Sequence, residues 1–343
     1  MSRHGRSRTP GAGSGLEGIL VLAKPPGPTS HDMVSLVRRI SATRRVGHGG
    51  TLDPFASGVL PLFLGQATRV VEYHLGDAKS YRATVCFGAS STTDDLEGEL
   101  TPVHGPAPDR SSVEAGLVDF RGSIEQTPPA YSAVKVAGRR AYAVARAGGT
   151  LELRPRTVTI TRLELIDWDG SDLERPVAVV EVDCSAGTYI RAIARDLGAA
   201  LGNAAYLGAL VRTSSGPFRL EDAVSLDTLR AAAGGEGAEE AAGTSAGLAA
   251  LLLPLDAGLE ALPALTLDPA DLPRVARGQA VRSTKSEPVE SPVRLFDAGG
   301  RLVAIGRWRG GTLLPDKVLV DAASTGDLPD RPPFVHVPSE DGA

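Results

Sequence analysis

The sequence predicts an α/β (α+β) protein in which one large domain is followed by a small β-rich domain. Residues 81–87 and 177–184 alternate apolar with polar or small side chains, which is the pattern of half-buried strands. Residues 190–201 instead carry apolar side chains at helical spacing, and Gly202 is a typical helix stop. Beyond Pro263, several short strand-like runs are separated by Gly, Pro and Asp. With 343 residues and 42% hydrophobic content, the chain is long enough for both cores.

The elements and domain boundaries follow in chain order. Residues 18–24 form a short apolar strand stopped by prolines, and a helix follows from about His31 to Ile40 with Ser30 as its cap. A later stretch of Ala, Gly and Glu cannot bury much apolar surface and predicts a connecting loop. We therefore expect a disordered tail (1–15), a large domain (16–263, with that loop at about 231–247), a β-rich domain (264–323) and a loose acidic tail (324–343).

Composition argues against a membrane or secreted protein and leaves a nucleic-acid partner open. No run approaches the roughly 18 to 20 apolar residues of a membrane span, and the N-terminus lacks the apolar centre of a signal peptide. Cys86 and Cys184 stand far apart without metal-ligand spacing, so we predict buried thiols in a reducing cytoplasm. The net charge is −5, yet residues 1–50 and 121–162 each hold 8 basic and 2 acidic side chains. Two such zones are compatible with binding a phosphate backbone, although each alone is also typical of a solvated surface.

The run Gly47–Leu60, GHGGTLDPFASGVL, is the most informative stretch of the chain. It places Asp53 on a glycine-rich loop between apolar segments, and the following proline pushes that residue into an extended conformation. One interpretation is a surface turn with a solvated aspartate, since Asp-Pro near Gly is common turn chemistry. The other is a carboxylate held on a stiff bend for catalysis.

This loop resembles the catalytic motif of the TruB family of pseudouridine synthases, which isomerise one uridine in the TΨC arm of transfer RNA. Gly49 stands where many members carry Thr. The runs 24–32 (KPPGPTSHD), 79–81 (KSY) and 184–191 (CSAGTYIR) also resemble family motifs, in the expected order. The resemblance therefore covers residues 18 to about 220, and it is weaker from about 264 onward.

The resemblance implies a fold, a reaction and partners. It implies a pseudouridine synthase fold with a mixed central sheet, flanking helices, a thumb insertion at about residues 122–157, and a PUA-like C-terminal domain. The expected enzyme is an isomerase that flips uridine 55 of tRNA into a pocket and converts it to pseudouridine. No cofactor and no metal are expected, and we expect a cytoplasmic monomer that acts without guide RNA.

Asp53 is the expected catalytic residue, by attack on the base, attack on the sugar, or deprotonation of the sugar; the sequence leaves these three routes open. Arg191 falls in the first turn of its helix, where a cation calls for an anionic partner. An arginine near Asp53 would hold its pKa down, and the resemblance assigns that pairing to Arg191. The resemblance also makes Tyr81 the platform that stacks on the flipped uracil, whereas composition alone favours a core aromatic.

Further substrate contacts are implied by the resemblance. His48 would fill the gap left by extruded bases, Tyr189 would line the pocket, and Leu210 would form an apolar wall, although the last two could equally be core residues. Lys24 would support the catalytic loop and could contact phosphate. The expected RNA-binding side chains of the thumb are Lys135, Arg139, Arg140 and Arg146.

Three other functions compete with this interpretation. The acidic cluster Asp94, Asp95, Glu97 and Glu99 could indicate a two-carboxylate hydrolase, but its spacing around Gly98 favours a solvated hairpin turn. A non-catalytic RNA-binding protein would have no reason to keep the acid in an apolar pocket. A guide-directed relative would lack the thumb insertion that residues 121–162 resemble.

Overall fold

The protein is described by a computed structural model over residues 15–132, 153–234, 245–282 and 292–320, with residues 135–136, 139–140, 144 and 149 between the first two ranges. Its centre is a nine-stranded sheet in the order β1-β3-β12-β4-β11-β10-β7, with β2 paired to β3 and β13 to β12. The β3–β12 pair is parallel and β12–β4 is antiparallel, so the sheet is mixed, as predicted. The strands are β1 (Gly18–Lys24), β2 (Val46–His48), β3 (Ser57–Leu64), β4 (Lys79–Phe87), β7 (Gly122–Gln126), β10 (Arg156–Asp169), β11 (Val177–Cys184), β12 (Ala205–Ser215) and β13 (Phe218–Arg219).

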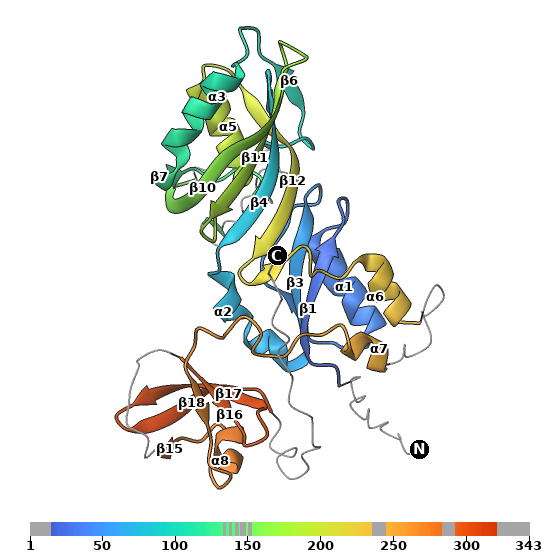
Figure 1. The fold of residues 1–343 in the computed structure, drawn as a ribbon, viewed down its shortest axis with the longest axis vertical. Coiled ribbons are helices and arrows are strands. Elements are labelled where there is room, and N and C mark those ends of the chain that lie inside the picture. The colour runs from blue at the N-terminus through green and yellow to red at the C-terminus, as the bar shows by residue number, and fades with distance from the viewer. Residues whose placement is uncertain are drawn as a thin grey trace, which may run out of the picture.

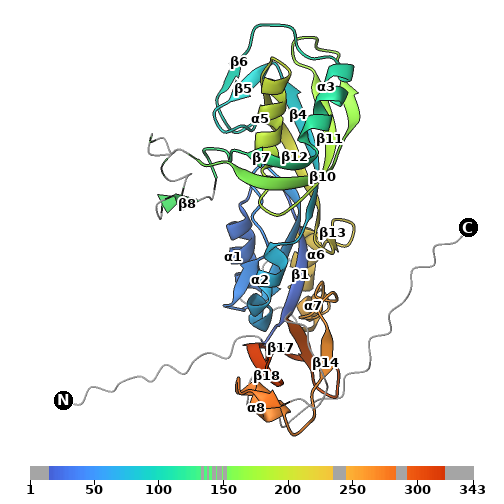
Figure 2. The same cartoon turned by 90° about the vertical axis from the view of Figure 1, so that its left-hand side faces the viewer.

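One half of this sheet is covered by α5 (Ile190–Ala200), α3 (Arg110–Gly116) and the 3-10 helix η2 (Leu117–Phe120). Figures 1 and 2 show these helices packed over β4, β10, β11 and β12 at one end of an elongated molecule. The core between them contains Val85, Val180, Ile193 and Leu197, as the alternation and the helical spacing predict. Gly202 has a φ of +70° just after α5, which makes it the expected stop.

The other half of the sheet, β1 and β3, is covered by α1 (Ser30–Ile40), α6 (Leu226–Ala232) and α7 (Ser245–Ala249). The cap of α1 is Thr29, one residue before the predicted Ser30. The Thr29 hydroxyl oxygen accepts from the Asp32 amide at 3.0 Å, and the Asp32 carboxylate accepts from the Thr29 amide at 2.8 Å. This reciprocal capping box satisfies two amide groups, whereas a cap at Ser30 would satisfy one.

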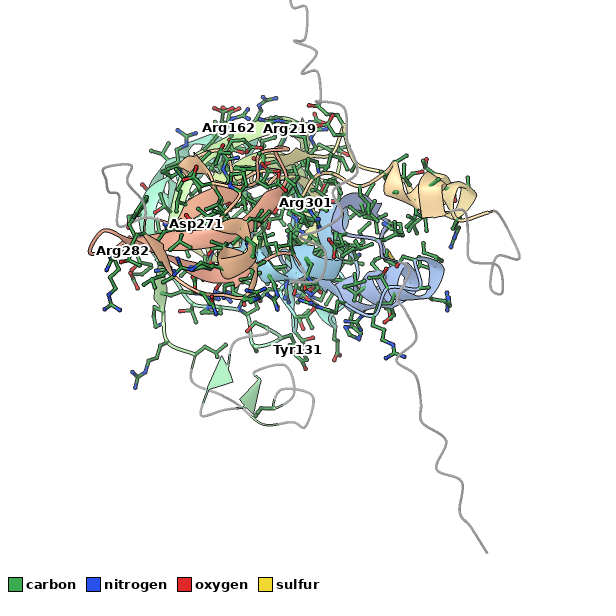
Figure 3. All side chains as sticks on the ribbon, turned by 90° about the horizontal axis from the view of Figure 1, so that it is seen from below. Tyr131, Arg162, Arg219, Asp271, Arg282 and Arg301 are labelled. Carbon is green, nitrogen blue, oxygen red and sulfur yellow. The ribbon has the colours of Figure 1, made fainter. Side chains whose placement is uncertain are left out.

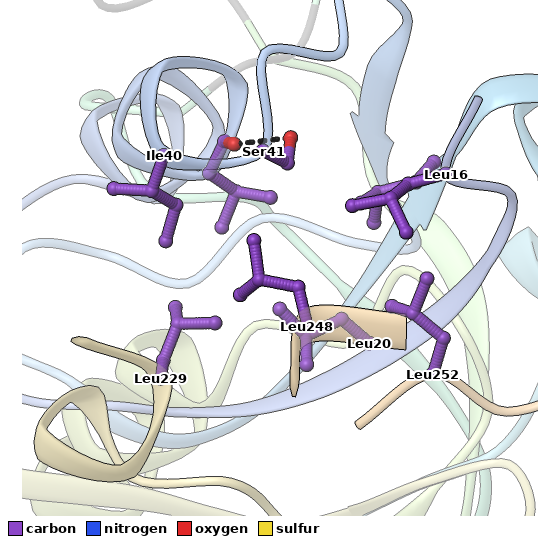
Figure 4. Close-up of a pocket in the computed structure, with 9 residues that line it drawn as sticks. Leu16, Leu20, Ile40, Ser41, Leu229, Leu248 and Leu252 are labelled. Carbon is purple, nitrogen blue, oxygen red and sulfur yellow. Dashed lines mark hydrogen bonds between the residues drawn. The ribbon is translucent and has the colours of Figure 1, made fainter. Parts of the chain in front are cut away.

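A small cavity of about 10 Å³ remains in this core (Figure 4). Eight of its nine lining residues are aliphatic, and the hydroxyl of the ninth, Ser41, donates to the Val37 carbonyl at 2.6 Å. A space of this size barely admits one water molecule and offers it no free partner among the described side chains. It is a packing gap and has no features of a ligand site.

The C-terminal part forms a separate five-stranded sheet in the order β14-β16-β17-β18-β15, so the predicted β-rich domain is present. Its elements are β14 (Ala264–Thr266), α8 (Leu272–Ala276), β15 (Val281–Arg282), β16 (Val293–Phe296), β17 (Leu302–Arg309) and β18 (Thr312–Val318). Leu302, Ile305 and Leu319 share one core with Ile19 and Phe63 of the large domain. The two domains therefore pack through buried apolar surface.

Two short elements of the large domain, η1 (Gly65–Arg69) and α2 (Val71–Leu75), complete this contact. Arg69 donates to the carbonyl of Val318, and Lys317 Nζ lies 2.8 Å from the Glu72 carboxylate. No helix in the described part of the chain is long and apolar enough to cross a membrane.

Two hairpins extend from the main sheet. One pairs β5 (Ala89–Ser91) with β6 (Leu100–Pro102), and the other pairs β8 (Lys135–Val136) with β9 (Arg139–Arg140). The second hairpin projects to the side in Figure 2, within the predicted thumb, and β7 and β10 pair at the base of that segment. The predicted tails and most of the low-complexity loop lie outside the described residues.

Candidate active site

Asp53 lies on the loop of residues 49–56 that joins the antiparallel strands β2 and β3. Neighbouring side chains hold the carbonyl groups of this loop. The Arg212 guanidinium donates to the carbonyls of Gly50 at 3.1 Å and Thr51 at 3.4 Å. The Ser30 hydroxyl donates to the Leu52 carbonyl at 3.0 Å and accepts from the Leu52 amide at 2.8 Å. The backbone on the N-terminal side of Asp53 is therefore fixed.

Lys24 fixes the loop on the other side of Asp53. Its ammonium donates to the carbonyls of Pro25, Pro54 and Ala56 at 3.0, 3.1 and 2.6 Å, and the residue is 1% exposed. An ammonium has three donors, and all three are engaged here. This supports the predicted structural role of Lys24 and leaves it no donor for a phosphate. Burial lowers the pKa of Lys24 to about 8, against the opposing effect of Asp53.

Gly58 allows the loop strand to approach β12 closely. Its φ is +107°, and a Cβ built there would lie 2.2 Å from the Arg212 carbonyl oxygen. Only glycine fits this position, because any side chain would both clash with the neighbouring backbone and strain its own. The close approach brings Arg212 against the loop that carries Asp53.

Arg191 joins Asp53 to a second carboxylate. Its Nε lies 3.0 Å from Asp53 Oδ2, and its Nη1 lies 3.2 Å from Asp95 Oδ2. The guanidinium also donates to the carbonyls of Thr93 and Tyr131, each at 2.9 Å. The predicted neighbourhood of Asp53 and Arg191 is therefore present, and the arginine is held from four directions.

Arg191 lowers the pKa of Asp53, as predicted, but the net shift of that pKa is upward. Burial of the carboxyl raises its pKa, Arg191 opposes that rise, and the negative charge of Asp95 adds to it. The arginine was expected to depress the pKa, but the loss of hydration on burial is the larger effect. About a third of the Asp53 side chain is still exposed, so the carboxylate remains open to solvent on one side.

Asp95 is the residue that the sequence analysis misplaced. The acidic cluster does lie on the β5–β6 hairpin, but Asp95 is 3% exposed and turned inward onto Arg191. Its Oδ1 accepts from the Thr93 hydroxyl at 2.5 Å and from the Glu97 amide at 3.0 Å. Asp94, with a φ of +62°, pairs with Arg195 at 2.8 Å. The turn was predicted correctly, and Glu97 and Glu99 are exposed as expected, whereas Asp95 is buried.

Tyr81 and Leu210 lie on the sheet face that Asp53 borders. Leu210 is buried in the same core as Leu52, and Tyr81 packs against that core while remaining half-buried. Burial raises the pKa of the Tyr81 phenol, and Arg212, its cross-strand neighbour, opposes the rise. Tyr81 is thus neutral at physiological pH and presents an aromatic ring near the carboxylate.

His48 and Tyr189 flank the site at the ends of two elements. The His48 Nδ1 accepts from the Gly50 amide at 3.3 Å, which assigns the proton of the neutral ring to Nε2. Burial and the charge of Arg212 lower the pKa of His48. Tyr189 stands immediately before α5, and the sequence analysis missed the two residues that hold it, Gln126 and Arg156.

The thumb residues are only partly described. The backbones of Lys135, Arg139 and Arg140 lie in the β8–β9 hairpin, whereas Arg146 falls outside the described residues. No cluster of three or more His, Cys, Asp or Glu side chains suited to a metal occurs in the described part of the chain.

A groove of about 590 Å³ borders β4, β10, β11 and β13, and it is lined among others by Tyr81, Arg82, Arg162, Glu181 and Arg219. Figure 3 shows Arg162 and Arg219 on the side of the molecule opposite Tyr131 and the β8–β9 hairpin. Glu181 forms ion pairs with Arg82 and Arg162, both at 2.9 Å, and Arg162 also pairs with Glu164 at 2.7 Å, so two carboxylates balance these two arginines. Asp53 is not among the residues that line this groove.

Comparison with known proteins places the chain among the pseudouridine synthases. Residues 38–190 match the TruB family pseudouridylate synthase N-terminal domain, residues 191–260 the tRNA pseudouridylate synthase B C-terminal domain, and residues 263–319 the C-terminal domain of pseudouridine synthase II TruB. The tRNA pseudouridine synthase B of Bradyrhizobium diazoefficiens is 42% identical over 308 residues, covering 88% of this chain and 86% of that protein. The enzyme of that name from Gloeobacter violaceus is 47% identical over 268 residues, covering 78% and 87%. Within the pseudouridine synthases, the chain belongs to the TruB family, as the sequence motifs indicated.

Solved structures support the same fold. A Cbf5-Nop10-Gar1 complex contains a chain that matches with a TM-score of 0.65 and 28% identity, covering 91% of this chain and 87% of that one. An H/ACA RNP bound to a substrate RNA contains another, with a TM-score of 0.62 and 26% identity, covering 89% and 86%. The predicted fold class is therefore confirmed.

Proposed function

We propose that this protein converts uridine 55 in the TΨC arm of tRNA to pseudouridine, with Asp53 as its essential catalytic group. Membership of the TruB family supports the reaction, and the names of the relatives support tRNA as the substrate. The observation that carries the assignment to Asp53 is the ion pair of 3.0 Å with Arg191 on a loop whose carbonyls are held by Lys24, Ser30 and Arg212.

The geometry suits a reaction on a nucleotide swung out of its helix. A flipped uridine needs a carboxylate beside its glycosidic bond and a flat surface for its ring. Asp53 supplies the first, and the half-buried ring of Tyr81 on the same sheet face suits the second. Leu210 would close the apolar side, and His48 would occupy the space that the base leaves.

The RNA would be held by positive charge around this site. The first basic zone, residues 1–50, contains α1 and Lys24. The second, residues 121–162, contains the thumb segment with Lys135, Arg139, Arg140 and Arg146. We propose a monomeric, cytoplasmic enzyme that recognises the arm directly and needs no cofactor.

The test is incubation of the purified protein with an unmodified tRNA transcript, followed by mapping of pseudouridine. We expect one modified position, 55, and no product from Asp53→Asn, while RNA binding stays close to that of the wild type. Asp119→Asn, which changes an exposed aspartate on η2, is the matched control and should remain active. Normal turnover by Asp53→Asn would refute the assignment.

A second candidate is action within a ribonucleoprotein, because one structural neighbour is part of an H/ACA RNP. The two candidates differ in whether the protein needs an additional RNA to modify its substrate. Product from protein and transcript alone supports direct recognition, whereas a strict requirement for an added RNA would support the second candidate.

A further inference from the structure

The segment that leads from β7 into the thumb is bound to α5 at several points. Gln126, the last residue of β7, is 1% exposed, and the oxygen and the nitrogen of its side-chain amide both bond the backbone of one residue. Its Oε1 accepts from the Tyr189 amide at 2.8 Å, and its Nε2 donates to the Tyr189 carbonyl at 3.1 Å. Such a paired contact fixes the backbone of Tyr189 much as a neighbouring strand would.

The next residues of this segment contact the same helix through its arginines. The Thr127 carbonyl accepts from Arg195 at 2.9 Å, and the Tyr131 carbonyl accepts from Arg191 at 2.9 Å. Figure 3 shows Tyr131 on the side of the molecule where the β8–β9 hairpin projects. The route into the thumb therefore runs along α5 and ends on the guanidinium that pairs with Asp53.

The returning strand contacts the same point. Arg156, the first residue of β10, is the direct antiparallel partner of Gln126. Its guanidinium carbon lies 4.7 Å from the centre of the Tyr189 ring. Both strands at the base of the thumb thus hold Tyr189, one through its backbone and one through its ring.

Tyr189 occupies the N-cap position of α5 but makes no side-chain capping hydrogen bond itself. Its φ and ψ of −101° and 111° are extended, and Arg191 follows two residues later. The direction in which α5 begins, and with it the position of the Arg191 guanidinium, is consequently set by what holds Tyr189. The buried amide of Gln126 is the principal holder.

We propose that Gln126 is a positioning residue for the Asp53–Arg191 pair, which it aligns by anchoring the start of α5 to the base of the thumb. The inference rests on the proposed function, since it assigns Gln126 to the same site. It couples the base of the thumb to the position of the Arg191 guanidinium.

The first test compares Gln126→Met with Glu125→Met. Methionine has nearly the volume of glutamine but cannot hold the Tyr189 backbone. Glu125 is exposed on the same strand, and its carboxylate accepts from the Thr157 hydroxyl at 2.5 Å. We expect the single-turnover rate of Gln126→Met on tRNA to fall by roughly tenfold or more, with its Kd for tRNA within about threefold of the wild type. Glu125→Met should match the wild type in both. Equal rates for the two variants would overturn the proposal.

The second test reads the ionisation of Asp53 without RNA. The charged or titratable groups that face this carboxyl are Arg191 from α5, Asp95 and Glu97 from the β5–β6 hairpin, Lys24 from β1 and Tyr81 from β4. Among them, Arg191 is the strongest influence that lowers the pKa of Asp53. A displaced guanidinium should therefore raise that pKa further.

The measurement is an NMR titration of protein labelled with ¹³C at aspartate carboxyls, with Asp53→Asn used to assign the signal. We expect the pKa of Asp53 to rise by about half a unit or more in Gln126→Met and to stay unchanged in Glu125→Met. A loss of fold stability alone would lower the amplitude of the Asp53 signal of the folded protein and leave the pKa of Asp53 unchanged. An unchanged pKa would overturn the proposal.

These results separate the inference from the proposed function. If the wild type leaves tRNA unmodified, the proposed function fails, and the titration still decides whether Gln126 aligns Arg191 with Asp53. In an Arg191→Lys background, Gln126→Met should cost little additional rate, because the group through which it acts is already changed. Full additivity of the two losses would contradict the proposed route.

Discussion

Replacing Asp95 by Asn tests whether Arg191 needs both of its carboxylates. The substitution keeps the shape of the side chain and one acceptor oxygen for Thr93 and Glu97, but it removes the charge 3.2 Å from Arg191 Nη1. Asp95 is 3% exposed, so water cannot replace the lost partner. Asp94→Asn is the matched control, because Asp94 pairs with Arg195 and asparagine tolerates its φ of +62°.

We expect Asp95→Asn to have two effects, one on the rate and one on the pKa of Asp53. Loss of one charge-assisted contact loosens Arg191 by about 1.5 to 3 kcal/mol, which corresponds to a rate lower by roughly 10- to 150-fold if all of it is felt in the transition state. Asp95 also helps to raise the pKa of Asp53, so its removal should lower that pKa. The rate plateau should therefore fall while the acid limb of the pH–rate profile moves to lower pH.

The assay is single-turnover pseudouridine formation between about pH 4 and 9, with urea unfolding measured in parallel. In the wild type, the rate should fall as pH drops through a value above 3.8, the ordinary pKa of aspartate, because Asp53 must be ionised and its pKa is raised. Asp95→Asn with a wild-type plateau would refute the role of the second carboxylate. A shift of its acid limb to higher pH would show that Arg191 has moved away from Asp53, because Arg191 influences the pKa of Asp53 more than Asp95 does.

Three further outcomes are expected. The pKa of Lys24 is about 8, so its ammonium is lost as pH rises through that value; the wild-type rate should decline there, and Lys24→Met should give a low rate without that limb. Gly58→Ala should lower the free energy of unfolding, measured in urea, by more than about 3 kcal/mol, since its Cβ would lie 2.2 Å from the Arg212 carbonyl oxygen. Near-native stability would contradict the steric account. Affinity for tRNA should fall steeply with salt as counterions are released, and a flat response would exclude the basic zones as contact surfaces.

The periodicity of the sequence was sufficient to place the main elements. The strand predicted at residues 177–184 has those bounds as β11, because apolar side chains alternate over its whole length and point into one core. The helix after it begins at Ile190 and stops before Gly202, where a positive φ is required. Local patterns decide such features, so no tertiary information was needed.

The site was predictable only where motifs carried it. Asp53 and Arg191 were expected to meet, and they do, but the sign of the pKa shift depends on how deeply the loop is buried. Asp95 was hidden in a run that has the composition of a solvated turn. Gln126 belongs to no pattern, because a polar residue at the end of a strand gives no sign that it will face a helix start 63 residues later.

The junction between the two domains has a consequence for RNA that reaches both of them. Leu302 and Ile305 share a core with Phe63, on the strand that leaves the catalytic loop, and Lys317 is tied to Glu72 beside it. The C-terminal sheet is therefore packed against the large domain and not joined to it by a linker alone. Because this junction is buried, a nucleic acid that touched both domains would meet two surfaces joined by a common core. Such a protein would favour RNA molecules whose shape lets them contact both domains at once, and this preference would require no further base-specific contact.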